Sequence, residues 1–539
     1  MIEKLKYSLR LTLYPIVAKV LHWSGVSWSK LAETSLRNEV MIAQSAHIHK
    51  TAVEFQQIVG GKNIVFFTML GAARYNLLVE IFIAAFLRYR GHSVRFVLDD
   101  AVLPIHEFIS PEKRGRKEVR NYYHFKFAVK LLKAWDFPIS YISELEAAVQ
   151  VDFSVTERFE DIIEASLLKH FKIGVINEHV EGLEDARNKI IQSITMTSAV
   201  GKYFATQNID LGVMSHGIYS TWGPVYQILR ENNIRVLTYG RGKKADTCKF
   251  NFNYTADWWD VTEAWEEIKD RALISAENKK IDGYLESRIT HKDDVMTYNF
   301  GDLEEASKTF SRFGLDKNKP VYSLFTNVLW DAASAQREII FNNPVEWVYE
   351  TIDWFINQPE KQLIIKIHPA EVVIGTKQPF KDIIDQKYPE LPENIVVIEP
   401  QEEVNSWSIY NVTDVGLVHT STVGMELPLV GVPCVVVSRT HYREKGFTID
   451  VSSREEYFDL LSSFDASSVD ALTLEEQSKK YAYLLFERYQ MPLNLFNTYS
   501  GNMDIRSFQI NSYKELLANE TLNKVSKAVE NEGISILND

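Results

Sequence analysis

Short apolar runs of strand length alternate with longer apolar segments of helix length along the first half of the chain. Residues 63–70 form a continuous apolar run, Gly71 interrupts it, and residues 75–90 have the length and apolarity of a buried helix. A second strand-like run follows at 93–98. This succession predicts a β-α-β unit, which builds a parallel sheet. The same succession recurs at 209–215, 224–231 and 234–239.

A second series of the same kind follows the polar stretch 276–320, which predicts a surface helix and a linker. The predicted strands are 320–326, 362–367, 394–398, 414–418 and 433–437, and the predicted helices are 344–357, 402–410 and 422–430. The pattern therefore predicts an α/β protein with two Rossmann-like lobes in tandem. Open parallel sheets bind ligands beyond the carboxyl ends of their strands, so we expect the two lobes to face each other across a cleft.

Four segments follow from this pattern. They are an N-terminal amphipathic or helical segment (1–55), a first lobe (56–305), a second lobe (306–470) and C-terminal helices that cross back to the first lobe (471–539).

The N-terminal segment is apolar between residues 9 and 28, but Arg10, Pro15 and Lys19 interrupt the run, so it does not predict a membrane span. Residues 1–30 carry a local net charge of +4 and include Trp23 and Trp28. A helix lying on the anionic inner face of the cytoplasmic membrane fits this pattern. A helix packed on the protein's own surface fits it equally well.

Composition excludes several classes of protein. The 539 residues carry a formal net charge of −13, which disfavours a nucleic-acid partner. The only cysteines, Cys248 and Cys434, are far apart in the sequence and lie in apolar or aromatic surroundings. Neither a disulfide framework nor a cysteine zinc site is expected, and a reducing cytoplasm is the predicted location.

The segment 414–446 is the most informative for chemistry. A predicted strand ends at Val418, and His419 and the hydroxyl residues Thr420, Ser421 and Thr422 then lead into a predicted helix. Hydroxyls and unpaired backbone N–H groups at a helix start bind anions, so a phosphate or diphosphate is the expected ligand. Glu426, one turn on, is placed to accept hydrogen bonds from a ribose diol. The alternative is a structural helix capped by Ser421 or Thr422.

A second candidate group ends the predicted strand 362–367. Lys366 and His368 would face the ligand edge of the sheet, where they could bind a nucleotide phosphate or donate a hydrogen bond to a leaving phosphate oxygen. The alternative for His368 is an ordinary structural histidine.

Three further loops follow predicted strands and carry polar and aromatic side chains together. Such pairs suit a sugar, whose faces are apolar and whose rim carries hydroxyls. Core packing is an equal alternative for Trp222 and Trp330, and the sequence GRGKK from Gly240 is equally a solvated turn. The candidates are Asn327, Trp330 and Asp331 in the second lobe, and His216, Tyr219, Trp222 and Arg241 in the first.

Several common motifs are missing from the sequence, namely the phosphate-loop, dinucleotide, HExxH and GxSxG patterns. Asp99 and Asp100 end a strand of the first lobe, but their spacing is not the Asp-x-Asp of metal-chelating sugar transferases. We therefore expect no obligatory metal and no cofactor.

The sequence KIHPAE, followed about fifty residues later by HTSTVGMELPLVGVPCVVV, resembles the His-Pro and Ser/Thr motifs of bacterial GT-B glycosyltransferases. The nearest resemblance is to capsule polysaccharide biosynthesis proteins, which include Kdo transferases, and a more distant one is to bacterial sialyltransferases. SHGIYSTWG, TNVLWDAA and the opening β-α-β unit also resemble segments of capsule-type proteins. The resemblance covers roughly residues 60–450.

The resemblance implies roles for individual residues. His368 would contact the donor phosphate and assist its departure, Ser421 and Thr422 would hold the same phosphate, and Glu426 would bind the ribose. The first lobe would bind the acceptor and the second lobe the nucleotide sugar. The base would come from the first lobe, as a carboxylate does in the sialyltransferases, and no motif selects one among Asp99, Asp100 and Glu178. Asp331 of the second lobe is a further candidate catalytic residue.

The predicted function is metal-independent transfer of a sugar from a nucleotide-sugar donor to a cell-surface polysaccharide or lipid-linked glycan. The residues around Glu426 depart from the aromatic-rich motif of Kdo transferases, so CMP-, UDP- and GDP-linked donors all stay open. Two alternatives remain. One is a nucleotide-sugar 2-epimerase or polyol-phosphate transferase on the same scaffold, and the other is a non-catalytic glycan-binding assembly protein.

Overall fold

A computed structural model describes most of the chain, which divides into two compact units. The described residues are 28–54, 61–69, 74–107, 125–148, 154–177, 179–244, 246–256, 258–290, 301–331, 337–465, 469–498, 505–533 and 535–538. Unit 1 comprises Met1–Phe159, Asn188–Tyr239 and Pro492–Ile536, and unit 2 comprises Glu160–Arg187, Gly240–Met491 and Leu537–Asp539.

Unit 1 is built on parallel strands. The seven-stranded sheet to which they belong has the order β13-β6-β5-β4-β1-β2-β3, and β1 to β5 pair with one another in parallel. Strand β6 lies within Gly240–Met491 and is counted with unit 2. The chain therefore starts in the middle of the sheet at β1, moves outward to β3, and returns to β4 on the other side. The strands are β1 (Asn63–Met69), β2 (Ser93–Leu98), β3 (Ile139–Tyr141), β4 (Leu211–Ser215), β5 (Arg235–Arg241), β6 (Thr247–Phe252) and β13 (Met491–Pro492).

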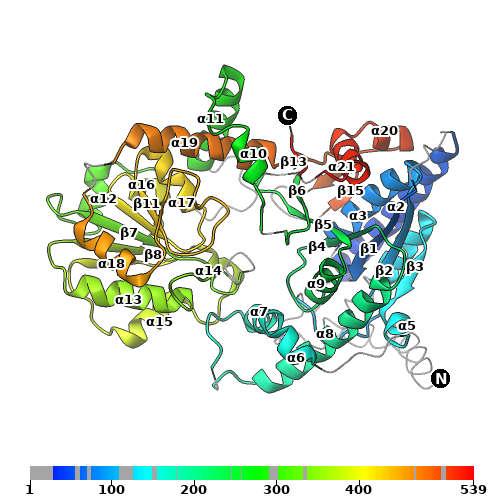
Figure 1. Cartoon of the computed structure of the whole chain (residues 1–539), viewed down its shortest axis with the longest axis horizontal. Helices are drawn as coiled ribbons and strands as arrows, with labels where there is room; N and C mark the ends of the chain where they lie inside the picture. Colours follow the sequence, from blue (N-terminus) through cyan, green and yellow to red (C-terminus); the bar gives the residue numbers. More distant parts are fainter. Residues whose placement is uncertain are drawn as a thin grey trace. The chain divides into compact units, whose positions relative to one another are not determined.

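Helices cover the sheet of unit 1 on both faces (Figure 1). One core joins strand side chains to α5, α8 and α9. On the other face, α3 packs against the C-terminal helix α21. The helices are α2 (Trp28–Lys50), α3 (Arg74–Tyr89), α5 (Ile142–Glu146), α6 (Val155–Arg158), α8 (Leu183–Ala205), α9 (Gly223–Glu231), α20 (Tyr513–Leu517) and α21 (Glu520–Glu530).

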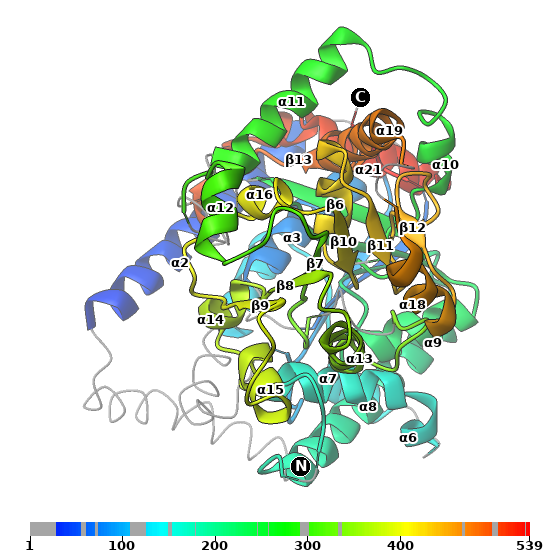
Figure 2. The same ribbon diagram turned by 90° about the vertical axis from the view of Figure 1, so that its left-hand side faces the viewer.

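Unit 2 repeats the same strand order. Its six strands run β12-β11-β10-β7-β8-β9, each pairs with its neighbours in parallel, and Figure 2 shows them side by side in this sequence. The order reverses between β7 and β10, so the loops after these two strands diverge and leave an opening at the carboxyl edge. The strands are β7 (Val321–Phe325), β8 (Gln362–Lys366), β9 (Ile395–Ile398), β10 (Val415–Val418), β11 (Cys434–Val436) and β12 (Ile449–Asp450).

Two apolar cores hold the layers of unit 2 together. One core packs α13 (Pro344–Ile356), α15 (Phe380–Lys387) and α18 (Arg454–Ser463) on one face of the sheet. The other core packs further helices on the opposite face (Figures 1 and 2). These helices are α10 (Thr262–Glu266), α11 (Ser275–Thr290), α12 (Ala306–Arg312), α16 (Ser406–Tyr410), α17 (Val423–Glu426) and α19 (Ala471–Tyr483).

The segment 160–187 belongs to unit 2 although its neighbours along the chain belong to unit 1. It contains α7 (Glu160–Phe171) and a loop held by Gln378, whose side-chain oxygen accepts from the N–H groups of Gly174 and Val175. The Lys169 ammonium lies over the Trp330 ring, 4.4 Å from its centre. Segment 160–187 therefore supports the loops that follow β7 and β8.

The predicted α/β class with two parallel-sheet lobes is confirmed by the two sheets. The division between compact units falls at Tyr239 and Gly240, so the predicted boundary at 305/306 lies inside unit 2. The reason is that the polar stretch 276–320 includes α11 and α12, which pack on the core of unit 2 instead of forming a linker. Residues 492–536 cluster with unit 1. The apolar run at 9–28 lies outside the described residues, apart from Trp28 at the start of α2.

Candidate active site

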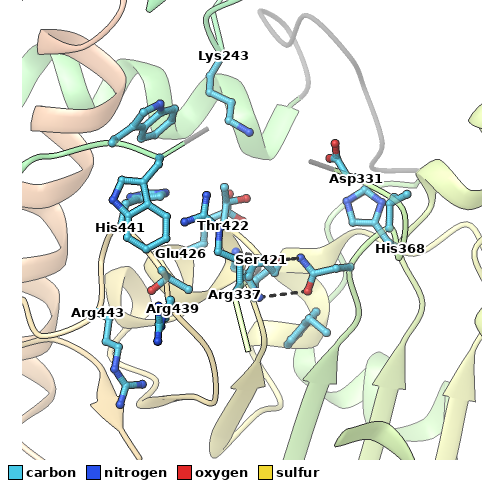
Figure 3. A pocket seen from close by; sticks show the side chains of 18 of the residues that line it. Lys243, Asp331, Arg337, His368, Ser421, Thr422, Glu426, Arg439, His441 and Arg443 are labelled. Carbon is cyan, nitrogen blue, oxygen red and sulfur yellow. Dashed lines mark hydrogen bonds between the residues drawn. The ribbon is translucent and has the colours of Figure 1, made fainter. Parts of the chain in front are cut away.

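A pocket of about 940 Å³ opens at the carboxyl edge of the unit 2 sheet, where the strand order reverses between β7 and β10. All the residues that line it belong to unit 2. Figure 3 shows Ser421, Thr422 and Glu426 in the middle of this pocket. The sequence candidates among the lining residues are Arg241, Asn327, Asp331, Lys366, His368, Thr420, Ser421, Thr422 and Glu426.

Asn327 joins the loops after β7 and β10. Its side-chain amide donates to the Thr420 hydroxyl, and its side-chain oxygen accepts from the Thr420 backbone N–H at 3.2 Å. Both residues line the pocket, so this paired contact links the two loops at the reversal point of the sheet.

The hydroxyl loop 420–422 is held from behind by Tyr442, whose hydroxyl donates to the Ser421 carbonyl at 2.6 Å. Gly424 lets that ring approach, because a Cβ there would lie 2.5 Å from the tyrosine oxygen. The helix that follows is shorter than predicted: α17 has four residues and continues into the 3₁₀ turn Pro428–Val430. Thr422 occupies its N-cap position without a side-chain capping bond, so its hydroxyl is not used as a cap.

Lys366 ends β8 and is 4% exposed. Burial lowers the pKa of its ammonium to about 8, although Glu402 acts in the opposite direction. An ammonium that has lost much of its hydration gains more than an exposed one from a bound anion.

His368 follows β8 and faces the pocket (Figure 3). Its Nδ1 accepts from the Ala370 backbone N–H at 3.1 Å. Burial, together with Lys243 and Lys366, lowers the His368 pKa to about 4, so the ring is neutral at pH 7. A neutral ring whose Nδ1 accepts must carry its proton on Nε2. His368 is therefore a neutral hydrogen-bond donor, as its predicted contact with a phosphate oxygen requires.

Glu426 is 4% exposed, and both of its oxygens have protein donors. Arg288 of α11 donates to one oxygen at 2.5 Å, and the Tyr410 hydroxyl donates to the other at 2.8 Å. This arrangement differs from the expectation of a carboxylate that awaits a ribose diol. An ion pair with Arg288, which the sequence did not suggest, neutralises its charge.

Positive charge dominates the lining of the pocket. Among the described lining residues, nine are lysine or arginine and four are aspartate or glutamate, on a chain of net charge −13. A concave site with a strong excess of one charge concentrates ligands of the opposite charge. The basic residues are Arg241, Lys243, Lys249, Arg288, Arg337, Lys366, Arg439, Arg443 and Lys445.

Aromatic rings alternate with these cations along one wall. The Arg337 guanidinium lies 4.0 Å from the centre of the Trp258 ring, and the Lys249 ammonium lies 4.6 Å from that of Trp259. Stacked cations of this kind keep a defined position while they still offer N–H donors. This wall combines flat apolar surface with positive charge.

Asp99 and Asp100 are in unit 1 and are not among the described residues that line the pocket. The Asp99 carboxylate accepts from the N–H groups of Val102 and Leu103, and burial raises its pKa to about 7. Asp100 accepts from both the N–H and the hydroxyl of Ser143. Both carboxylates thus shape the turns after β2 and before α5. Glu178 lies outside the described residues.

The three aromatic candidates of unit 1 are core or near-core residues. Trp222 is 1% exposed and donates its indole N–H to the Phe67 carbonyl at 2.8 Å, so its ring cannot contact a sugar. Tyr219 is 5% exposed. His216 lies 2.7 Å from the Ser215 hydroxyl and packs beside Trp222. Trp222 and Tyr219 therefore pack in the core, which is the alternative to a sugar contact.

Several lining residues were missed by sequence reasoning, among them Lys249, Arg288, Arg337, Arg439 and His441. The loop after β11, SRTHYREKG, follows a predicted strand in the same way as the loops that were singled out. Because parallel sheets bind ligands beyond the carboxyl ends of their strands, Arg439 and His441 in this loop could have been predicted as site residues. Arg288 lies on a helix whose composition predicts a solvated surface, and no signal in the sequence marked it.

Two negative findings apply to the part of the chain that the structure describes. No group of three or more histidine, cysteine, aspartate or glutamate side chains is arranged to hold a metal ion there. Within the same residues, no helix has both the length and the apolarity needed to cross a bilayer.

No protein-family model and no curated protein sequence matches the chain. The solved structures found include a beta-Kdo 2,4 transferase, KpsC of Thermosulfurimonas dismutans, at 14% identity and TM-score 0.35, covering 58% of this chain and 88% of that one. They also include the UDP-GlcNAc 2-epimerase of Neisseria meningitidis, at 12% identity and TM-score 0.26, covering 79% and 99%. The glycosyltransferase SnogD of Streptomyces nogalater matches at 9% identity and TM-score 0.23, covering 79% and 95%.

The solved structures to which the chain is similar thus include two Kdo transferases and a further glycosyltransferase. These similarities concern the fold alone, and at these TM-scores they assign no substrate and no residue role. The chemistry of this chain rests on its own pocket.

Proposed function

We propose that the chain is a glycosyltransferase whose unit 2 pocket binds the phosphate and sugar of a nucleotide-sugar donor. The observation that carries this proposal is the excess of basic side chains around the reversal point of a parallel sheet, with Asn327, Thr420 and His368 converging on it. This is the place where nucleotide-binding α/β sheets hold their ligand. The acceptor is a cell-surface glycan or a lipid-linked glycan, reached from the cytoplasmic face of the membrane.

In this mechanism the donor phosphate lies against Lys366, His368 and the hydroxyls of residues 420–422. As the bond between the anomeric carbon and the phosphate oxygen breaks, negative charge grows on that oxygen. The Nε2–H of His368 and the Lys366 ammonium stabilise this charge, and they do so most strongly in a site with little water. The nine basic side chains supply positive charge of the kind that a metal ion would otherwise provide, so we propose that the reaction needs no metal.

The test is calorimetric titration of the full chain with CMP, UDP and GDP in the presence of EDTA. We expect one nucleotide to bind, and Lys366→Met to weaken it about tenfold or more, because removing a charge-assisted contact costs about 1.5–3 kcal/mol. Lys308→Met is the matched control: it removes the same charge from the exposed surface, where Lys308 pairs with Glu304. Equal losses in the two variants, or no binding to the wild type, would contradict the proposal.

Product analysis with and without an acceptor then separates transfer from its alternatives. Conversion of the donor sugar without any acceptor would indicate a nucleotide-sugar 2-epimerase. Binding without turnover would indicate an assembly protein.

A further inference from the structure

The pocket contains a second histidine, His441, whose hydrogen bonds fix the position of its proton. The Nδ1 atom of His441 lies 2.8 Å from the Tyr481 hydroxyl oxygen. The same hydroxyl lies 2.7 Å from the His441 backbone carbonyl, to which it donates. A tyrosine hydroxyl has one hydrogen and a carbonyl has none, so that hydrogen is used on the carbonyl. Nδ1 must therefore carry a proton and donate it to the Tyr481 oxygen.

This assignment leaves a lone pair on Nε2. Burial keeps the His441 pKa well below its usual value, and Lys243, Arg337, Lys249 and Lys445 lower it further, so the ring is neutral. A neutral imidazole with its proton on Nδ1 has an acceptor at Nε2. Among the described residues, none donates a hydrogen bond to that atom.

Packing holds the His441 ring in one orientation. The Tyr481 ring lies nearly parallel to it, at 5.9 Å and 16°, and the Trp259 ring lies 4.6 Å away. The Tyr481 ring is itself fully buried in the main core of unit 2. The ring nitrogens of His441 therefore keep fixed positions relative to the pocket wall.

The two pocket histidines have opposite tautomers. His368 carries its proton on Nε2 and accepts at Nδ1, whereas His441 carries its proton on Nδ1 and accepts at Nε2. They lie on opposite sides of the pocket, with Ser421 and Thr422 between them (Figure 3). One wall thus offers a hydrogen-bond donor to a leaving oxygen, and the other offers a proton acceptor. Paired groups with opposite proton roles are typical of acid–base catalysis.

We propose that His441 is the catalytic base of the site, and that its Nε2 takes the proton of the attacking hydroxyl. This inference rests on the proposed function. The acceptor oxygen forms a bond to the anomeric carbon, and its O–H bond breaks with the proton passing to Nε2. The bond between the anomeric carbon and the phosphate oxygen breaks with its electron pair staying on that oxygen, which the Nε2–H of His368 contacts.

The donor itself makes His441 a better base. The four cations that lower its pKa also line the pocket, so a bound phosphate offsets their charge. The imidazolium then forms while the leaving phosphate gains negative charge, and the two changes stabilise each other. Tyr481 is a positioning residue, because it acts by holding the proton on Nδ1.

The described carboxylates of the pocket are less suited to this role. Asp331 lies beside His368, on the leaving-group side (Figure 3). Asp260 accepts from the Thr262 backbone N–H at 3.1 Å, and the Glu444 side chain is 80% exposed.

The first test is nitrogen NMR of the full chain labelled with ¹⁵N-histidine, with His441→Gln and His368→Gln used for assignment. At pH 7 we expect His441 to be neutral with its proton on Nδ1, and His368 to be neutral with its proton on Nε2. Tyr481→Phe should let the His441 proton move to Nε2. A His441 ring that is charged at pH 7, or that carries its proton on Nε2 in the wild type, would overturn the proposal.

The second test is hydrolysis of UDP-glucose, GDP-mannose and CMP-N-acetylneuraminate, in which water replaces the acceptor. His441→Gln should lower kcat about 100-fold or more with KM changed less than about threefold, because a general base contributes about 10² to 10⁴ in rate. An unchanged kcat in His441→Gln, with kcat lost in Asp331→Asn, would overturn it.

Nucleotide titration of the same samples distinguishes failure of the proposed function from failure of the His441 assignment. Absence of binding in the wild type contradicts the proposed function, and the NMR tautomer still decides the proton position of His441. Normal binding with the wrong tautomer contradicts the assignment of His441 alone.

Discussion

Lys366 is a buried ammonium whose pKa of about 8 lies near physiological pH. Its charge therefore changes with pH in the range in which nucleotide binding is measured. Its folded pKa is lower than the ordinary value of 10.5, so the unfolded chain binds this proton more tightly. The free energy of unfolding should therefore rise with pH between about 8 and 10.5 as far as this group is concerned.

Nucleotide binding should change in the opposite direction. The ammonium that attracts the phosphate is lost above about pH 8, so we expect affinity for the preferred nucleotide to fall between about pH 7 and 9. The measurement is a series of calorimetric titrations across that range. Lys366→Met should bind more weakly and should show a flat profile. A wild-type profile as flat as that of the variant would exclude titration of Lys366 as the cause.

Asn327 offers a second test at the level of single residues. Asn327→Ala removes both contacts to Thr420 and takes away the acceptor of a partly buried N–H. We expect a loss of about 1–3 kcal/mol in the free energy of unfolding and about tenfold weaker nucleotide binding. Denaturant unfolding and calorimetry measure these effects. Asn318→Ala is the control, because Asn318 makes its contacts within an exposed turn.

The sequence predicted the pocket residues that directly follow apolar strands, such as Lys366, His368 and Thr420, because such runs mark strands and strand ends mark the ligand edge. The sequence could not decide whether Trp222 packs in the core or binds a sugar, because the burial of Trp222 depends on residues distant in the chain, such as Phe67. It also missed Arg288, whose partner Glu426 is 138 residues away.

At the scale of elements, the short helix α17 depends on Gly424. Gly424→Ala would place a methyl group against the Tyr442 hydroxyl that holds the Ser421 carbonyl. We expect a loss of about 1–3 kcal/mol in the free energy of unfolding, from overpacking, and weaker nucleotide binding. Thermal unfolding and calorimetry test both effects.

Gly283→Ala is the matched control for this change. Gly283 lies inside α11 with open space around its Cβ position, so alanine should stabilise the chain by about 0.5–1 kcal/mol. An equal change in the free energy of unfolding in both alanine variants would show that the close approach of Tyr442 to Gly424 does not contribute to stability.

Segment 160–187 depends on one side chain in the same way. Gln378→Ala removes the acceptor for the Gly174 and Val175 N–H groups and the donor to the Val175 carbonyl. We expect proteolysis of this segment to become faster and nucleotide affinity to fall by severalfold, because the loops after β7 and β8 lose support. Gln401→Ala, at an exposed turn, is the control. Unchanged proteolysis would show that apolar packing alone holds the segment.

The long strands of both sheets and the helices α3, α9 and α13 were predicted within a few residues, since continuous apolar runs of distinct length mark them. Helices α7, α8 and α18 were not predicted. Strands β3, β6, β12 and β13 were not predicted either. β3 and β12 have three and two residues, and β6 (TCKFNF) mixes polar and apolar residues. Such strands are defined by pairing with neighbours more than by their own composition.

At the scale of the whole molecule, unit 1 depends on the C-terminal residues 492–536. Arg90 makes two hydrogen bonds of 2.7 Å to Glu530, and the Tyr513 hydroxyl donates to the Ala85 carbonyl. Phe508 packs edge-on against Phe82. These contacts cover α3 from the far end of the sequence. A chain that ends at residue 491 should therefore lose the cooperative unfolding of unit 1, as measured by calorimetry.

A chain that ends at residue 536 is the control for this truncation, because it keeps all of unit 1 and loses only the last three residues. Cooperative unfolding of both truncated chains would show that the C-terminal helices are dispensable for unit 1.

The position of the boundary between the units could not be predicted from the sequence. The stretch 276–320 is mostly polar, so its composition is that of a linker even though its few apolar residues pack on the core of unit 2.

The chain passes from one unit to the other five times, at 159/160, 187/188, 239/240, 491/492 and 536/537. On the ribosome, unit 1 therefore lacks its C-terminal helices until residues 492–536 have been made. Unit 2 likewise begins at Glu160 but waits for β11 and α19. While these segments are still missing, each unit exposes apolar sheet faces that a chaperone would need to shield.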